Sequence, residues 1–126
     1  MARKKQGLSF DKRGGTIVLC RKLIESENYQ TLSTHARALM ILIQVQWRPY
    51  EYVDYGVREA EKRLVCNRKT AMKAFNQLIE RGFLICMEQS MFRSRTQSKT
   101  RSWRLTWLPF DYKPPTNDWE KWGAKN

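Results

Sequence analysis

The clearest hydrophobic pattern in the chain lies between Ser33 and Pro49. Apolar residues recur there three and four positions apart, as on one face of a helix: Ala36, Leu39, Met40, Ile43 and Trp47. Ser33 is a good N-cap because its hydroxyl can accept a hydrogen bond from a free backbone N–H. Pro49 ends the stretch because proline cannot continue the hydrogen-bond ladder. The pattern therefore predicts a helix that buries one apolar face.

Two more helices, separated by a tight break, are predicted between Gly56 and Gly82. The first follows Gly56 and turns three apolar residues inward: Val57, Ala60 and Leu64. A break at residues 65–67 comes next, and Asn67 can cap a helix over 68–81. The inner face of that helix carries four residues: Ala71, Ala74, Phe75 and Leu78. Gly82 suits the left-handed conformation that stops a helix.

Strands are predicted on either side of these helices. Residues 16–20 are β-branched and apolar, which indicates a short strand. Residues 83–88 and 102–108 are predicted to pair as a long hairpin. The apolar face of its second strand carries Trp103, Leu105 and Trp107. Arg104 and Thr106 then fall on the opposite face, because side chains alternate along a strand.

These elements divide the chain into an arm, a domain and a tail. Residues 1–15 form a basic arm, residues 16–110 the domain, and residues 111–126 a tail that packs on the domain or on a partner. Within the domain, a short helix over 21–29 follows the first strand. Two later helices joined by a tight break, with a hairpin directly after them, describe a winged helix-turn-helix. We predict an α+β fold of this kind, with a three-helix core and a β-hairpin wing.

The charge of the chain indicates an anionic partner. Lys and Arg number 24 against 12 Asp and Glu, which gives a net charge of +12. Nucleic acid is the commonest partner of so basic a domain. No apolar run is long enough to span a membrane, so we expect no membrane association. The basic start is not followed by an apolar segment, so no secretory signal is expected either.

The residue types give little support for a metal site or a catalytic site. The three cysteines, Cys20, Cys66 and Cys86, are far apart and next to apolar residues, which favours buried free thiols. His35 is the only histidine. A metal site needs clustered ligands, and a nuclease would need a cluster of metal-binding carboxylates. We therefore expect no metal, no other cofactor and no catalytic site.

The helix predicted over 68–81 carries a polar face that suits base recognition. Its outer positions are Arg68, Lys69, Thr70, Lys73, Asn76 and Gln77. Arginine and lysine can donate to guanine, and asparagine and glutamine can pair with adenine. The alternative is that this helix face is exposed to solvent and binds no ligand. The hairpin beside it favours a recognition helix in the major groove of double-stranded DNA.

The stretch between the hairpin strands is the second candidate for contact with nucleic acid. No acidic residue occurs from Gln89 to Phe110. Four basic residues lie in the predicted wing, residues 89–101: Arg93, Arg95, Lys99 and Arg101. Arginines at a hairpin tip suit phosphates or a narrow minor groove. A flexible basic loop with no defined ligand is the alternative.

Several segments together resemble small winged helix-turn-helix DNA-binding proteins of proteobacteria and their mobile elements. Residues 32–39 (LSTHARAL) are similar to the opening of their first helix. Their helix-turn-helix core is similar to three segments: VREA at 57–60, NRKTA at 67–71 and LIERGFL at 78–84. Residues 103–109 (WRLTWLP) and 113–116 (KPPT) resemble their last strand and tail. The departure is the tyrosine-rich stretch 48–55, where a polar turn rich in asparagine and glycine is expected.

The resemblance implies a DNA-binding regulator of transcription or replication from a mobile element, in the bacterial cytoplasm near the nucleoid. The alternative is a protein-interaction adaptor or inhibitor of a nucleic-acid-handling complex, of the phage counter-defence type, built on a winged helix. RNA binding is a third reading.

Aromatic residues outside the predicted core indicate a partner surface, because interfaces are rich in tyrosine and tryptophan. The candidates are Tyr50, Tyr52 and Tyr55, or Trp119 and Trp122. A homodimer is slightly favoured over a monomer. The alternative is that the tail folds back and covers apolar surface.

Overall fold

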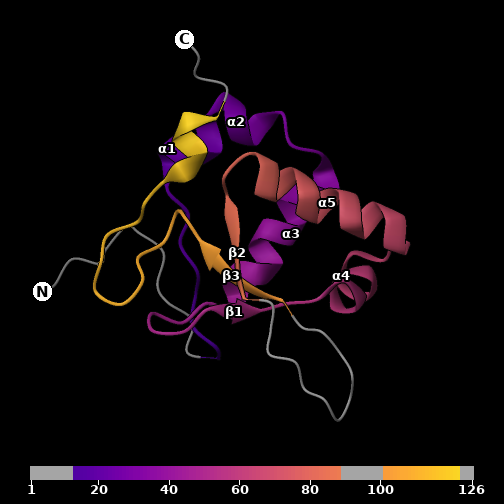
Figure 1. Cartoon of the computed structure of the whole chain (residues 1–126), viewed down its shortest axis with the longest axis horizontal. Helices are drawn as coiled ribbons and strands as arrows, with labels where there is room; N and C mark the ends of the chain where they lie inside the picture. The colour runs from indigo at the N-terminus through magenta and orange to yellow at the C-terminus, as the bar shows by residue number, and fades with distance from the viewer. Residues whose placement is uncertain (1–12, 89–100, 123–126) are drawn as a thin grey trace, which may run out of the picture.

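The computed structural model describes residues 13–88 and 101–122. These residues form an α+β fold, drawn in Figure 1. They contain five α-helices, three strands and a final 3-10 helix. In chain order the elements are α1 (Arg21–Glu25), α2 (Glu27–Gln30), α3 (Thr34–Val45), β1 (Val53–Asp54), α4 (Val57–Leu64), α5 (Arg68–Glu80), β2 (Leu84–Glu88), β3 (Ser102–Leu105) and η1 (Asp118–Lys121). Most of the predicted arm and all but the end of the predicted wing lie outside the described residues.

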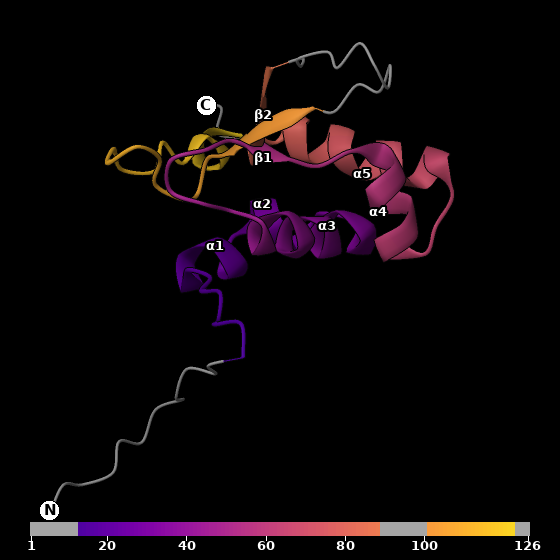
Figure 2. The ribbon, with the colours of Figure 1, turned by 90° about the horizontal axis from the view of Figure 1, so that it is seen from below.

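The three strands form one antiparallel sheet in the order β1-β3-β2. Val53 pairs with Trp103 across the first interface, and Leu84 pairs with Leu105 across the second. The sheet overlaps α3 in Figure 1, and the turned view of Figure 2 shows that the two lie one above the other. The expected hairpin after α5 is therefore present. The arrangement is compatible with a winged helix.

The predicted helix caps are confirmed. The Ser33 hydroxyl accepts a hydrogen bond from the backbone N–H of Ala36 at 3.1 Å, and the Asn67 side chain accepts one from Thr70 at 2.8 Å. Helix α3 ends at Val45, however, before Pro49 is reached. Trp47 therefore lies beyond the helix rather than on its apolar face. Its half-buried ring still packs against the core.

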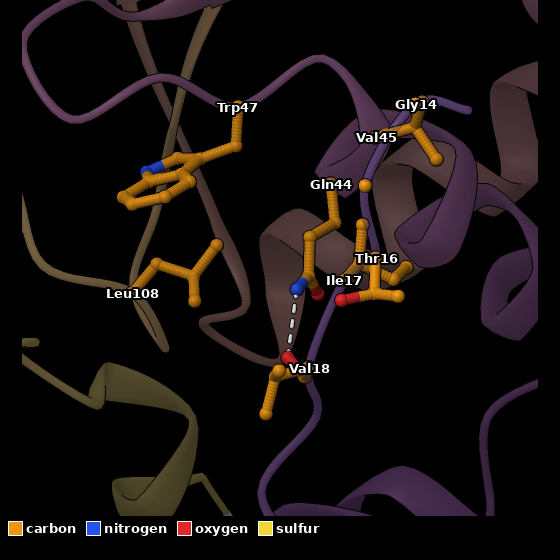
Figure 3. A pocket seen from close by; sticks show the side chains of 9 residues that line it. Gly14, Thr16, Ile17, Val18, Gln44, Val45, Trp47 and Leu108 are labelled. Carbon is orange, nitrogen blue, oxygen red and sulfur yellow. Dashed lines mark hydrogen bonds between the residues drawn. The ribbon is translucent and has the colours of Figure 1, made fainter. Parts of the chain in front are cut away.

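The strand predicted at residues 16–20 is wrong. This segment has no regular secondary structure and is not part of the sheet, and Ile17 and Val18 are 41% and 68% exposed. One side chain holds it: Gln44 donates from Nε2 to the Val18 carbonyl at 2.8 Å (Figure 3). A β-branched run forms a strand only where a neighbouring strand can pair with it. The helix predicted over 21–29 is also split, because Ser26 caps a new helix.

Strand β3 is shorter than predicted. It ends at Leu105, and Thr106 is fully buried instead of facing outward. The backbone N–H of Thr106 donates to the Phe83 carbonyl, and its hydroxyl donates to the Gly82 carbonyl at 2.7 Å. Buried polar groups need such partners. The local turn therefore interrupts the alternation that the sequence indicates.

The core joins α3, α4, α5, the sheet and the tail. Phe75 of α5 stacks on Trp103 with ring centroids 5.2 Å apart, and Phe83 stacks on Trp119 of η1 at 5.8 Å. Gly82, with φ +83°, stops α5 as predicted and lies against the backbone of Asp118. The tail therefore packs on the domain.

The cysteines differ from expectation. All three are free, as predicted, but Cys20 and Cys86 are exposed and only Cys66 is half-buried. The reason for Cys20 is the missing strand, which leaves its segment at the surface. Among the described residues, no helix is long and apolar enough to cross a membrane.

Candidate nucleic-acid interface

Helix α5 presents a polar face that its packing leaves open to solvent. The predicted inner residues, Ala71, Ala74, Phe75 and Leu78, are all buried. The break before the helix is tight because Val65 adopts a left-handed conformation, with φ 54°. On the opposite face, four of the predicted site residues are exposed: Arg68, Lys69, Lys73 and Asn76. The core therefore holds the helix in the orientation that the sequence predicts.

Two predicted site residues are less accessible. Thr70 and Gln77 are half-buried. The Oε1 atom of Gln77 accepts a hydrogen bond from the backbone N–H of Ser33 at 2.8 Å. This bond links the last turn of α5 to the start of α3. Gln77 is thus partly committed to holding the two helices together.

The contact between these helices creates a groove that sequence reasoning missed. The groove has a volume of about 490 Å³. It is lined by Ser33, His35, Thr70, Lys73, Asn76, Gln77 and Glu80. The first two residues come from the start of α3, where the helix dipole is positive and favours anions. The N-cap signal at Ser33 marks that helix start, but only the tertiary fold brings it to α5.

The only basic residue of the predicted wing among the described residues is Arg101, since Arg93, Arg95 and Lys99 lie outside them. The Arg101 side chain is exposed, and its guanidinium carbon lies 6.0 Å from the centre of the Trp103 ring. Its carbonyl accepts a hydrogen bond from the backbone N–H of Tyr55, directly before the N-cap of α4. Arg101 therefore marks the base of the hairpin, near the start of α4.

The charges on α4 are more evenly balanced than those on α5, where Glu80 is the one carboxylate beside three cations. Arg63 forms an ion pair with Glu59 at 2.9 Å. A shallow groove beside it is lined by both signs of charge: Arg58, Glu59, Glu61, Lys62 and Cys66. An anionic ligand would be attracted less strongly here than to α5.

A third groove has no charged lining. It has a volume of about 640 Å³ and lies between residues 14–18, the end of α3 and Leu108 (Figure 3). Gln44 is its main polar side chain, and both ends of its amide are bonded. Besides donating to Val18, it accepts a bond from the Trp107 indole at 2.9 Å. This groove offers no group suited to a phosphate.

The aromatic partner candidates separate into buried and exposed residues. Tyr55 and Trp119 belong to the core, with exposed fractions of 5% and 4%, so neither can supply a partner surface. Trp122 is half-buried under the Arg81 guanidinium, 4.2 Å from the ring centre. Tyr50 and Tyr52 remain exposed.

The described residues contain no group of three or more histidine, cysteine or carboxylate side chains placed to hold a metal ion. Comparisons of the chain with protein-family models, with curated proteins and with solved structures found no match.

Proposed function

We propose that this protein is a winged-helix protein that binds double-stranded DNA. The observation that carries the proposal is the difference between the two faces of α5. One face is fully packed in the core, and the other exposes Arg68, Lys69, Lys73 and Asn76. The chain around it has a net charge of +12. The order of helices and strands, with a tight break before α5 and a hairpin after it, supports the same conclusion.

In this proposal α5 enters the major groove and its exposed face meets the base edges, most closely at its N-terminal end. Arg68 and Lys69 lie where guanine can be read, and the Asn76 amide can pair with adenine. The start of α3 borders the same groove as Lys73, so a backbone phosphate can approach that helix end while Lys73 faces the bases. The hairpin follows phosphates or the minor groove.

The biological setting follows from the family resemblance. We propose a regulator of transcription or replication encoded by a mobile element and acting on DNA in the bacterial cytoplasm. No catalytic step is part of the proposal.

Fluorescence anisotropy against a random duplex, a single strand and an RNA hairpin tests this function. The duplex should bind most tightly, and its affinity should fall steeply with salt. Each neutralised phosphate contributes a slope of about −0.9 in log K against log salt, so five to eight contacts imply roughly −4 to −7.

A duplex slope near zero, or no duplex binding at low salt, contradicts the proposal and favours the protein-interaction adaptor instead. Tighter binding of the RNA hairpin than of the duplex favours an RNA-binding function. Neither result depends on knowing the target sequence.

A further inference from the structure

Two turns that are distant in the sequence meet at one end of the sheet. The backbone N–H of Asp111 donates to the Pro49 carbonyl at 2.8 Å, and the Tyr50 hydroxyl donates to that of Tyr112 at 3.1 Å. Tyr52 stacks on Phe110 with ring centroids 4.7 Å apart. Both turns extend from the end of the sheet away from α4 in the two views (Figures 1 and 2). They bring together four rings, named here the tyrosine surface: Tyr50, Tyr52, Phe110 and Tyr112.

The tyrosine surface exposes much aromatic area. The exposed fractions are 56% for Tyr50, 39% for Tyr52 and 87% for Tyr112. Aromatic side chains dominate contact energies when they become buried between proteins. A contiguous group of exposed rings on a small domain is therefore a candidate interface.

Tyr112, whose ring is the most exposed of the four, has an unfavourable backbone conformation. Asp111 and Tyr112 have φ of 53° and 65°, and Phe110 and Lys113 pair on either side of them. Such a two-residue turn favours asparagine and glycine, because a large side chain is crowded in the left-handed region. Residues held in this way often have a functional role. The stability of the fold therefore does not favour a tyrosine at position 112.

The charges around the rings indicate what would cover them. Four charged side chains are exposed on the same two turns: Arg48, Glu51, Asp111 and Lys113. The charges of these four side chains cancel, although the whole chain carries +12. A further cation, the half-buried Arg104 guanidinium, lies 5.1 Å from the centre of the Phe110 ring. A polyanion gains little from a surface whose exposed charges cancel. A second copy related by a two-fold axis can place the cations of each chain opposite the anions of the other.

We propose that the tyrosine surface is an isologous interface between two copies of this chain. Tyr50, Tyr52 and Tyr112 of one copy pack on the same residues of the other, with the four charged residues at the rim. The proposal does not rest on DNA binding, and it leaves the exposed face of α5 outside the interface.

Sedimentation equilibrium of the full chain, freed of nucleic acid, tests the interface from micromolar to millimolar concentration. The wild type should approach twice the mass of one chain. Tyr112→Gly removes the ring where the backbone already favours glycine, so folding is not at risk. It should raise the dissociation constant about tenfold or more.

Val65→Gly is a matched control, because Val65 is also 87% exposed with a positive φ but lies between α4 and α5. It should leave self-association unchanged. A wild type that stays monomeric at millimolar concentration overturns the proposal, and so does an equal effect of the two variants.

A charge exchange gives a second test. One variant carries Arg48→Glu with Lys113→Glu, and the other carries Glu51→Lys with Asp111→Asn. Each variant alone should stay monomeric, because like charges then face one another. Their mixture should form heterodimers. No association in the mixture, with the wild type dimeric, places the interface elsewhere and overturns the proposal. Duplex binding by Tyr112→Gly, assayed in parallel, reports on the proposed function separately.

Discussion

The role of a side chain in this protein depends on its contact as much as on its type. Asn76 and Gln77 are adjacent amides on α5, and either could pair with adenine. The Gln77 oxygen accepts a bond from Ser33, whereas the Asn76 side chain is exposed. Asn76 is therefore the amide better placed to read a base, and Gln77 is better placed to hold α3 against α5.

Contacts also decide the role of Tyr55, which the sequence suggested as part of a partner surface. Its ring is part of the core, and its indole neighbour Trp103 donates to the Tyr55 carbonyl at 2.8 Å. Burial raises the pKa of the Tyr55 hydroxyl above its ordinary value of 10.0, and the charge of Glu59 raises this pKa further against the opposing effect of Arg63. The phenolate form is thus disfavoured in the folded protein.

This shift predicts a pH-dependent stability. A raised pKa means that the folded state binds the proton more tightly than the unfolded chain does. The stability that this difference contributes is fully present below the pKa of the unfolded chain. It is lost as pH rises through the pKa of the folded state. At neutral pH Tyr55→Phe should change the free energy of unfolding by about 1 kcal/mol or less, because the buried Tyr55 hydroxyl has no hydrogen-bond partner among the described residues and no bond is lost. Above a pH of about 10 it should lose less stability than the wild type does.

Urea unfolding at neutral and alkaline pH measures both effects. Tyr29→Phe is the control, since Tyr29 is half-buried at the edge of the core. Equal alkaline losses in the wild type, Tyr55→Phe and Tyr29→Phe would show that Tyr55 does not contribute.

At the scale of elements, α5 and the hairpin approach a ligand differently. The four exposed residues of α5 project from a helix whose other face is packed in the core, so their positions are well defined. Arg101 lies where the hairpin leaves the sheet, beside the start of α4. A rigid helix suits contacts with particular bases, whereas a basic hairpin suits phosphates, which are alike in every sequence.

The two elements should therefore respond differently to alanine substitution. Lys73→Ala or Asn76→Ala should cost about 1–3 kcal/mol of binding to the preferred duplex and relax the preference at one base position. Arg101→Ala should weaken binding to all sequences alike and reduce the salt slope by about 1. Duplex selection followed by titration at several salt concentrations measures both.

Lys22→Ala is the control for loss of one positive charge. Lys22 lies on α1 and pairs with Glu120 at 3.3 Å. Its removal should leave preference and affinity nearly unchanged. If Arg101→Ala altered base preference and the α5 variants did not, the two roles would be reversed.

At the scale of the whole molecule, the tail is part of the domain. The Asn28 amide donates to the Trp119 carbonyl at 2.6 Å, which joins the tail to α2. The backbone N–H of Asn117 donates to the Thr106 carbonyl at 2.8 Å, which joins it to the end of β3. Trp119 then fills the space beside Phe83.

Removing the Trp119 ring should destabilise the protein. Trp119→Ala should lower the free energy of unfolding by about 3–5 kcal/mol, as expected for a large buried aromatic residue. Trp122→Ala should cost about 1 kcal/mol, because that ring is half-buried and lies under the Arg81 guanidinium. A chain ending at Pro109 should not unfold cooperatively. Thermal denaturation followed by circular dichroism compares all three, and a stable shortened chain contradicts this account.

Local signals in the sequence determined the helical part of the fold. The caps at Ser33 and Asn67, the apolar spacing of α3 and α5, and the stop at Gly82 each depend on neighbours a few residues away. Such signals therefore have the same meaning before and after folding. They also sufficed to predict which face of α5 is buried. Of the six polar residues expected on the outer face, four are exposed, whereas Thr70 and Gln77 are half-buried.

Tertiary structure decided the rest, because the deciding partners are far apart in the sequence. Residues 16–20 have the composition of a strand but no strand to pair with, and Thr106 is buried because Gly82 and Phe83 accept its hydrogen bonds. Tyr55 and Tyr50 belong to the same tyrosine-rich stretch, yet one is in the core and the other at the surface. A strand needs a partner, a buried polar group needs an acceptor and a buried ring needs neighbours. The composition of a segment does not specify any of these partners.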